Sequence, residues 1–101
     1  MLSAGLLRDL RAYHRALGDV TRMRIVQLLA TAGEQTVSDL RLQLRVSQPL
    51  MSWHLNRLKR AGIILMTRQG RAVHCALDRT RFAELHDRDF RTLMNSNEAR
   101  S

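Results

Sequence analysis

Apolar residues recur every three or four positions through most of the chain, and this spacing predicts helices. The first two helices are expected over residues 3–17 and 20–32. Gly18 and Gly33 follow them as stop residues, and Asp19 is placed to cap the second helix. The face that the second helix is expected to bury consists of Met23, Val26 and Leu29, with Ile25 and Leu28 beside it.

The next two helices are separated by a very short connection. Thr36 is expected to open a third helix, because Asp39 follows three residues later in a variant of the capping box. Ser47 caps a fourth helix, and Pro49 lies in its first turn, where a missing N–H costs no hydrogen bond. Only "RVS" joins the two helices, which predicts a helix-turn-helix over residues 36–61.

After Gly62 the apolar period changes. The runs "IILMTR" and "RAVHCAL" flank "QG", which predicts a β-hairpin over residues 63–77 with a two-residue glycine turn. Helical spacing returns over residues 79–95. The expected fold is therefore mainly α with a small β-hairpin: a single winged helix-turn-helix domain over residues 1–101, its helices packed around a two-stranded wing.

The chain carries a large excess of positive charge. Its formal net charge is +8, from 17 basic and 9 acidic residues, and every basic residue except Lys59 is an arginine. Such an excess indicates an acidic partner, most often nucleic acid, although a source rich in arginine codons would give the same composition. No glycine-rich phosphate loop, nucleophile elbow or cluster of acids at hydrolase spacing appears, so an enzyme is not expected.

Cys75 is the only cysteine of the chain. One thiol excludes an internal disulfide and a cysteine metal cage within one chain, and it fits a reducing compartment. No apolar run approaches the ~20 residues of a membrane helix, and the start "MLSAGLLRDLR" is too soon charged for a secretory signal. These features predict a cytoplasmic protein with no membrane partner.

The fourth helix presents two different faces when its residues are placed at about 100° intervals. Met51, Leu55 and Leu58 form the expected buried stripe. The opposite side consists of Pro49, Ser52, Trp53, Asn56 and Arg60, with Arg57 at its edge and Gln48 at the N-terminus. Its amide, hydroxyl, indole and guanidinium groups match the donors and acceptors of base edges in a major groove. The residues of this helix predicted to contact DNA are Gln48, Pro49, Ser52, Trp53, Asn56 and Arg57. For any one of these residues the alternative is a solvated surface side chain.

Trp53 has two possible roles that the sequence leaves equally open. Its indole can lie against a thymine methyl or a sugar, or it can pack on a neighbouring helix and support the DNA-contacting face. An exposed tryptophan also suits a winged-helix module that uses Trp53 as an anchor for a protein partner. The dependence of binding affinity on salt concentration distinguishes DNA binding from protein binding, because DNA binding by many cations weakens steeply as the salt concentration rises.

The predicted hairpin tip forms a second candidate contact. Arg68, Gln69 and Arg71 would project beyond the sheet, and arginines at a tip can enter a narrow minor groove or bind the adjacent phosphates. An ordinary solvated turn is the alternative, because turns are usually polar.

Three segments, "ALGDVTRMRIVQLL", "SQPLMSWHLNRLKRAGII" and "RQGRAVHCALD", resemble the ArsR family of winged-helix repressors over roughly residues 12–78. The resemblance implies a homodimer that binds a double-stranded operator, with residues 1–17 and 79–95 as dimerisation helices. It also implies that DNA is released when a metal or another signal arrives. Gln48, Pro49, Ser52 and Trp53 align with the family's base-contacting stretch, and Arg68 and Arg71 align with its wing.

The chain departs from the family at its sensing positions. Thr36 and Ser38 stand where metal-sensing members carry two cysteines. At a second metal site of the family, this chain has Arg79, Arg81, Thr92 and Asn95. These residues are poor ligands, so no metal or cofactor is expected, and the inducer stays open. Arg45 replaces the glycine common before the fourth helix, which puts the usual left-handed turn in question.

A few residues of reactive chemistry remain. Cys75, beside His74, is expected to be a buried, inert thiol, with a reactive one as the alternative. His86 is expected at a dimer seam, paired with Asp89, and a site shared with His14 of a second chain is the weaker alternative. The apolar seam of the expected dimer consists of Leu6, Leu10, Phe82 and Leu93.

Overall fold

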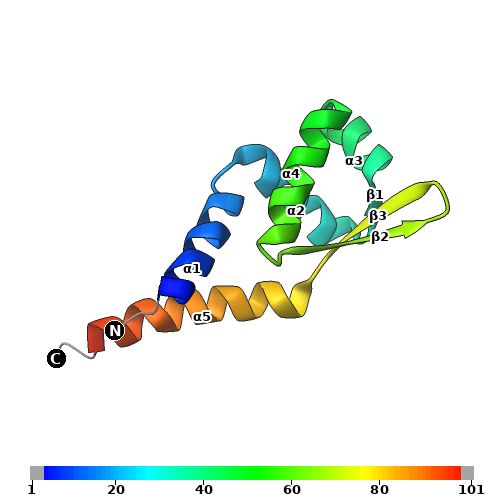
Figure 1. The fold of residues 1–101 in the computed structure, drawn as a ribbon. Coiled ribbons are helices and arrows are strands. Elements are labelled where there is room, and N and C mark those ends of the chain that lie inside the picture. The colour runs from blue at the N-terminus through cyan, green and yellow to red at the C-terminus, as the bar shows by residue number, and fades with distance from the viewer. Residues whose placement is uncertain (1–3, 99–101) are drawn as a thin grey trace.

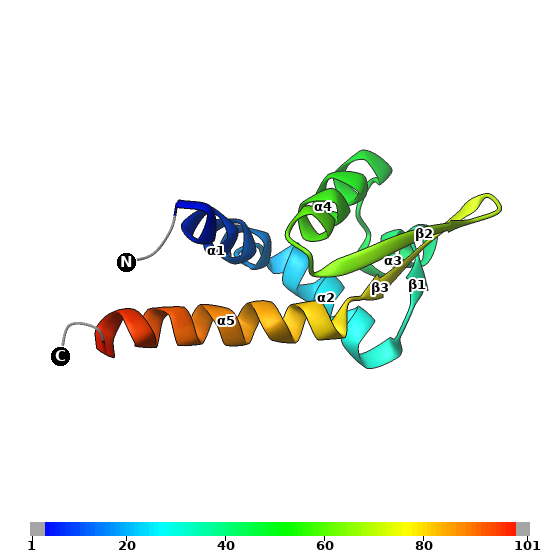
Figure 2. The ribbon, with the colours of Figure 1, turned by 60° about the horizontal axis from the view of Figure 1, so that its bottom comes forward.

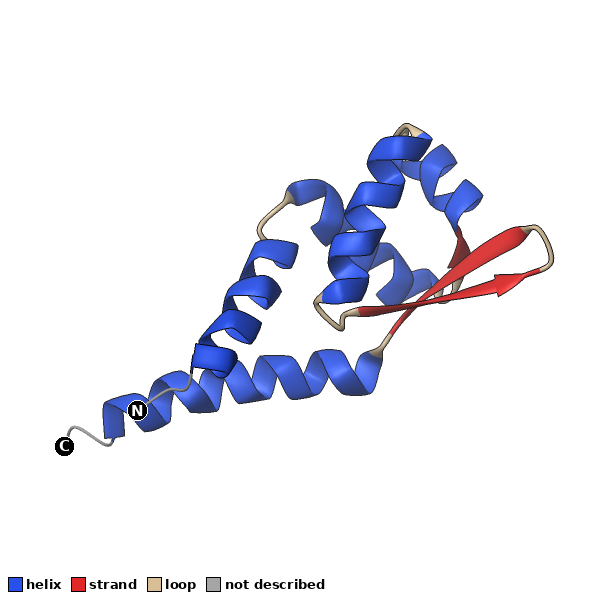
Figure 3. Ribbon diagram, in the orientation of Figure 1, coloured by secondary structure: helices blue, strands red, loops and turns tan. Residues whose placement is uncertain are grey.

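The computed structural model describes the backbone of residues 4–98 and, within that range, all side chains except those of Leu6, Asp89, Phe90, Thr92, Leu93 and residues 95–98. Figure 1 and Figure 3 show helices in the order expected, with a twisted hairpin before the last helix. The elements are α1 Ala4–Leu17, α2 Val20–Ala32, β1 Gln35–Thr36, α3 Val37–Leu44, α4 Gln48–Arg60, β2 Ile64–Gln69, β3 Ala72–Leu77 and α5 Arg79–Glu98.

The helices begin at the residues that the sequence indicates. The Asp19 carboxylate accepts a hydrogen bond from the Arg22 N–H at 3.0 Å and caps α2. Thr36 and Asp39 form the predicted capping box of α3, with the Asp39 N–H donating to the Thr36 hydroxyl at 3.0 Å. Ser47 accepts from the Leu50 N–H at 3.4 Å at the start of α4. These local bonds satisfy helix N–H groups that have no partner within the helix.

Gly62 ends α4, as the sequence predicts. Its φ of 81° lies in the left-handed region, where a residue with a Cβ is strained. The Gly62 N–H donates to the Lys59 carbonyl and the Ile63 N–H to the Leu58 carbonyl, both at 3.0 Å. This pair of bonds is a Schellman motif, and it directs the chain from α4 straight into β2.

The sheet has one strand more than the two-stranded wing that was predicted. β1 pairs antiparallel with β3, Gln35 opposite Cys75 and Thr36 opposite His74, so the strand order is β1-β3-β2. A strand of two residues has no alternation from which to predict it. The hairpin turn is also one residue later than expected, because Gln69 already pairs with Ala72 and leaves Gly70 and Arg71 as the turn.

The core lies between the helix-turn-helix, the base of the wing and α2, and Tyr13 and Ala16 of α1 and Leu85 of α5 are part of it. Its completely buried side chains include the predicted α4 stripe of Met51, Leu55 and Leu58. The prediction for α2 was partly wrong: Val26 and Leu29 are buried, but Met23 is 47% exposed. Arg22 takes the buried position instead, with 6% of its surface exposed.

The first and last helices lie side by side, away from the wing (Figure 1, Figure 2). Arg88 of α5 lies 3.5 Å from the Asp9 carboxylate of α1. The Tyr13 hydroxyl lies 3.4 Å from His86 Nδ1, and the Tyr13 ring packs at 6.1 Å from the Phe82 ring. These contacts attach α5 to α1. Among residues 4–98, no helix is both long enough and apolar enough to cross a membrane.

Candidate nucleic-acid interface

The turn between α3 and α4 keeps the left-handed conformation that the arginine at position 45 put in question. Arg45 has φ 55° and ψ 47°, and its N–H donates to the Arg41 carbonyl. A left-handed conformation costs a residue with a Cβ roughly 1–2 kcal/mol, so the hydrogen bonds and packing around the turn must offset this strain. The turn therefore sets the angle between α3 and α4 despite its unfavourable residue.

The outward face of α4 is available to a partner. All six residues predicted to contact DNA from α4 are exposed: Gln48, Pro49, Ser52, Trp53, Asn56 and Arg57. Their helix is fixed from behind, because Met51, Leu55 and Leu58 are completely buried. The α4 sequence contains no acidic residue, so nothing on this helix opposes an approaching polyanion.

Trp53 lies at the edge of this face, packed on one side and open on the other. The Arg57 guanidinium lies 4.6 Å from the centre of the indole and the Arg22 guanidinium 5.3 Å away. The His54 ring meets it edge-on at 5.1 Å. The indole is still 48% exposed, so it supports the face through the cations it contacts and also presents an aromatic surface outward.

A buried arginine fixes α4 against the first two helices. Arg22 Nε donates to the Ala16 carbonyl at 2.7 Å, and Arg22 NH2 donates to the Arg15 carbonyl at 3.0 Å. Its third nitrogen, NH1, lies 3.0 Å from His54 Nδ1. One guanidinium thus joins the end of α1, the start of α2 and the middle of α4. The burial of Arg22 was not predicted, although Arg22 stands three and four positions before the buried Ile25 and Val26.

The protonation state of His54 follows from this contact. Burial lowers the pKa of His54 below its usual value, and the charges of Arg22 and Arg57 lower it further, against the opposing effect of Asp19. Neutral His54 accepts the Arg22 hydrogen bond at Nδ1. The Asp19 carboxylate, 3.9 Å from that nitrogen, is too distant for a hydrogen bond. His54 is therefore a buried packing residue that contacts α2 through Arg22.

The wing tip is a second exposed cationic surface. Arg68, Gln69 and Arg71 are all exposed at the end of the hairpin. Gly70 has φ 64°, and no other turn residue has a positive φ, which matches a type II′ turn with glycine at its first central position. The structure therefore brings two predicted groups of candidate residues to the surface, one on α4 and one at the wing tip.

Two of the residues at the family's metal-sensing positions have other partners. Thr36 serves as the cap of α3, and Arg79 NH2 donates to the Ala30 carbonyl at 2.8 Å. Ser38 and Arg81 are exposed, whereas the side chains of Thr92 and Asn95 lie outside the described residues. Within the described part of the chain, no three His, Cys, Asp or Glu side chains gather as a metal site requires.

The thiol and the histidines are not brought together. Cys75 is completely buried, and this burial, together with the charge of Glu34, raises its pKa to about 11. A thiol with so high a pKa is protonated at neutral pH, which supports the inert interpretation. His74 Nδ1 lies 3.2 Å from the Glu34 carboxylate, and this pair was not predicted. His86 meets Tyr13, and its predicted partner Asp89 lies outside the described side chains.

Known proteins resemble the chain in both sequence and fold. The family profile described as "Bacterial regulatory protein, arsR family" matches residues 19–65. The arsenical resistance operon repressor of Escherichia coli (strain K12) is 44% identical over 63 residues, which cover 62% of this chain and 54% of that protein. The transcriptional repressor SdpR of Bacillus subtilis (strain 168) is 36% identical over 66 residues, covering 65% of this chain and 72% of that repressor.

A solved structure shares the whole fold. The homodimeric winged helix-turn-helix DNA-binding domain Mb0332 from Mycobacterium bovis superposes with a TM-score of 0.73 at 24% identity, covering 95% of this chain and 85% of that one. The winged helix-turn-helix prediction is thereby confirmed. The chain spans about half the length of several curated relatives that it matches.

Proposed function

The chain belongs to the ArsR family of bacterial regulatory proteins, a family of DNA-binding regulators rather than enzymes, and on that premise we propose a specific role for it. It acts as a dimeric repressor that binds an inverted-repeat operator in double-stranded DNA. The observation that carries this proposal is the outward face of α4, an exposed row of hydrogen-bonding groups on a helix whose other face is completely buried.

The α4 residues divide by chemistry into two kinds of contact. The amides of Gln48 and Asn56 suit adenine edges, and the Ser52 hydroxyl suits several bases. Arg57 suits guanine or a phosphate, and Pro49 fixes the first turn, whose free N–H groups favour a phosphate. The Arg41 guanidinium lies 3.4 Å from the Gln48 side-chain oxygen, which supports an orientation of this amide before DNA binds.

The wing binds mainly through charge. Arg68 and Arg71 flank Gly70 at the tip, where two guanidinium groups can bind phosphates or enter a narrow minor groove, and Gln69 adds an amide beside them. This contact is separate from α4, so the two parts can be tested by different substitutions.

Dimerisation places two copies of α4 on one operator. α1 and α5 lie side by side, and Leu7 of α1 and Met94 of α5 are 49% and 44% exposed, which supports an apolar seam on these helices. Of the four seam residues predicted, Leu10 is buried within its own chain and Phe82 packs against the core, while the side chains of Leu6 and Leu93 lie outside the described residues. Two-fold symmetry then spaces the recognition helices about 34 Å apart, one turn of DNA.

We do not propose a metal as the signal that releases DNA, although relatives of the chain are named for arsenical and cadmium resistance. Thr36 and Ser38 offer hydroxyls instead of thiolates, and Arg79 and Arg81 would repel a cation. We expect zinc or cadmium to leave operator affinity unchanged. A stoichiometric metal that releases DNA would contradict this and direct attention to His14, His74, Cys75 and His86.

A protein-binding module is the alternative function, and the exposed half of Trp53 is the observation that favours it. Selection from a random duplex library, with binding measured from about 50 to 200 mM salt, distinguishes the two. The DNA-binding proposal predicts enrichment of an inverted repeat and a steep loss of affinity with salt. No enriched sequence, together with salt-insensitive binding of a protein partner, would favour the module.

A further inference from the structure

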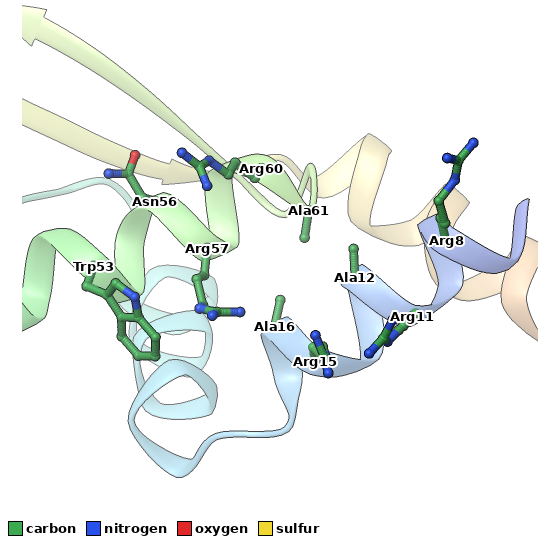
Figure 4. A pocket seen from close by; sticks show the side chains of 10 residues that line it. All are labelled: Arg8, Arg11, Ala12, Arg15, Ala16, Trp53, Asn56, Arg57, Arg60 and Ala61. Atoms are coloured by element: carbon green, nitrogen blue, oxygen red, sulfur yellow. The ribbon is translucent and has the colours of Figure 1, made fainter. Parts of the chain in front are cut away.

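A groove of about 430 Å³ runs between α1 and the C-terminal half of α4, and its walls are strongly cationic (Figure 4). Ala12 and Ala16 of α1 lie opposite Ala61 at the end of α4, so small side chains keep the groove open. Five arginines line it, and none of its lining residues is acidic: Arg8, Arg11, Arg15, Arg57 and Arg60. The remaining lining residues, Trp53 and Asn56, belong to the face of α4 already assigned to DNA.

The arginines of α1 share one face of that helix. Positions 8, 11 and 15 are separated by three and then four residues, a spacing that places side chains on the same side of a helix. The one acidic residue of α1, Asp9, is directed elsewhere, because its carboxylate lies 3.5 Å from Arg88 of α5. Three arginines of α1 therefore line the groove, and the one acidic residue of this helix contacts α5.

The position of this face relative to α4 is fixed. Arg22 donates to the carbonyls of Arg15 and Ala16 and contacts His54 of α4, so the end of α1 is joined to the recognition helix by one buried side chain. The Arg57 guanidinium points from α4 toward α1 in Figure 4. The groove is thus a preformed continuation of the α4 face and not a separate pocket.

We infer that this groove binds the sugar–phosphate backbone of the operator beside the bases contacted by α4, which makes α1 a second DNA-binding element. Five exposed guanidinium groups repel one another until a polyanion neutralises them. Arg8 to Arg15 spans roughly 10 Å along α1, and phosphates on one strand recur about every 3.4 Å along the DNA axis, so up to about three of them fit this length. The inference rests on the proposed function.

The test is a salt titration of Arg11→Ala/Arg15→Ala against operator and scrambled duplexes. Each lost phosphate contact should flatten the slope of log K against log salt by about 0.9, so the double variant should lose about 1.8 per bound protomer. Operator and scrambled affinity should fall by similar factors. A control variant, Arg24→Ala, removes one charge from an exposed site of α2 outside the groove and should keep most of the slope. Arg11→Lys/Arg15→Lys should restore most of the slope, which distinguishes charge from packing.

The outcomes distinguish a failure of the groove inference from a failure of the proposed function. If the wild-type protein binds no duplex, the proposed function fails. If it binds with a steep slope and the groove variant behaves like the Arg24→Ala control, only the groove inference is overturned. Inorganic pyrophosphate is the second probe: micromolar, stoichiometric binding at about 150 mM salt that disappears in the groove variant would identify a small-anion site and overturn the assignment to DNA.

Discussion

Replacing Arg22 by Ala should destabilise the protein more than any change to its exposed arginines. The substitution removes donors from three acceptors: the Ala16 and Arg15 carbonyls and the His54 ring. The Arg15 carbonyl keeps a hydrogen bond from the Gly18 N–H at 3.3 Å, so it loses least. The Ala16 carbonyl and His54 Nδ1 lose this donor in buried surroundings.

The size of the loss follows from those two acceptors. A buried group left without a partner costs about 1–3 kcal/mol, so two of them give roughly 2–6 kcal/mol. At roughly 4–8 °C per kcal/mol for a domain of this size, a loss of about 4 kcal/mol, in the middle of this range, lowers Tm by at least about 16 °C. Urea and thermal unfolding followed by circular dichroism, at one fixed protein concentration, measure both quantities.

Arg24→Ala provides the matched control, because it removes the same charge from an exposed position of the same helix. This substitution should change the free energy of unfolding by no more than about 0.5 kcal/mol. Arg22→Lys should have a free energy of unfolding between those of Arg22→Ala and the wild-type protein. An ammonium group keeps the charge, but it lacks the planar guanidinium geometry that contacts three acceptors. If Arg22→Ala unfolds like Arg24→Ala, the buried guanidinium does not join the helices and the account of how α4 is fixed is wrong.

Three further outcomes are expected. Arg45→Gly should raise the free energy of unfolding, measured in urea titrations, by up to about 1 kcal/mol. Glycine relieves the left-handed strain of roughly 1–2 kcal/mol, but it also adds flexibility to the unfolded chain. A lower free energy of unfolding would contradict this expectation. Cys75 should resist a thiol reagent at pH 8 in the folded protein and react after unfolding, and rapid labelling of native protein would refute its burial. The pKa of His54 in the folded protein is lowered from 6.5, so the unfolded chain binds more protons as the pH falls below that value. The contribution of His54 to stability should therefore be full above about pH 6.5 and decrease as the pH drops. His54→Gln should flatten this part of the profile of unfolding free energy against pH.

The helix-turn-helix could be predicted because its signals are local. Thr36 with Asp39 and Ser47 with Pro49 act within one helical turn, so the sequence alone places the starts of α3 and α4. The exposed face of α4 followed from helical spacing for the same reason. The left-handed backbone conformation of Arg45 was harder to predict, because it depends on surrounding contacts that no local sequence pattern indicates.

The remaining features depend on contacts between distant segments. Arg22 was not singled out from the sequence, because a charged side chain is usually exposed. Its burial is explained by the carbonyls at the end of α1 and by His54, which are contacts that spacing along the chain does not report. β1 has two residues, and only pairing with β3 makes them a strand. The cationic groove combines α1 and α4, which lie more than thirty residues apart in sequence, so spacing along the chain could not reveal it.

The most direct measurement compares α4 variants with wing variants on operator and scrambled duplexes at several salt concentrations. Gln48→Ala and Ser52→Ala should each lose about 1–3 kcal/mol on operator and little on scrambled DNA, because their hydrogen bonds depend on the base. Arg68→Ala and Arg71→Ala should weaken both duplexes nearly alike and flatten the salt slope by about 0.9 per lost phosphate contact. If the Gln48 and Ser52 variants bind both duplexes as the wild-type protein does, α4 does not read the operator, and the central claim is contradicted.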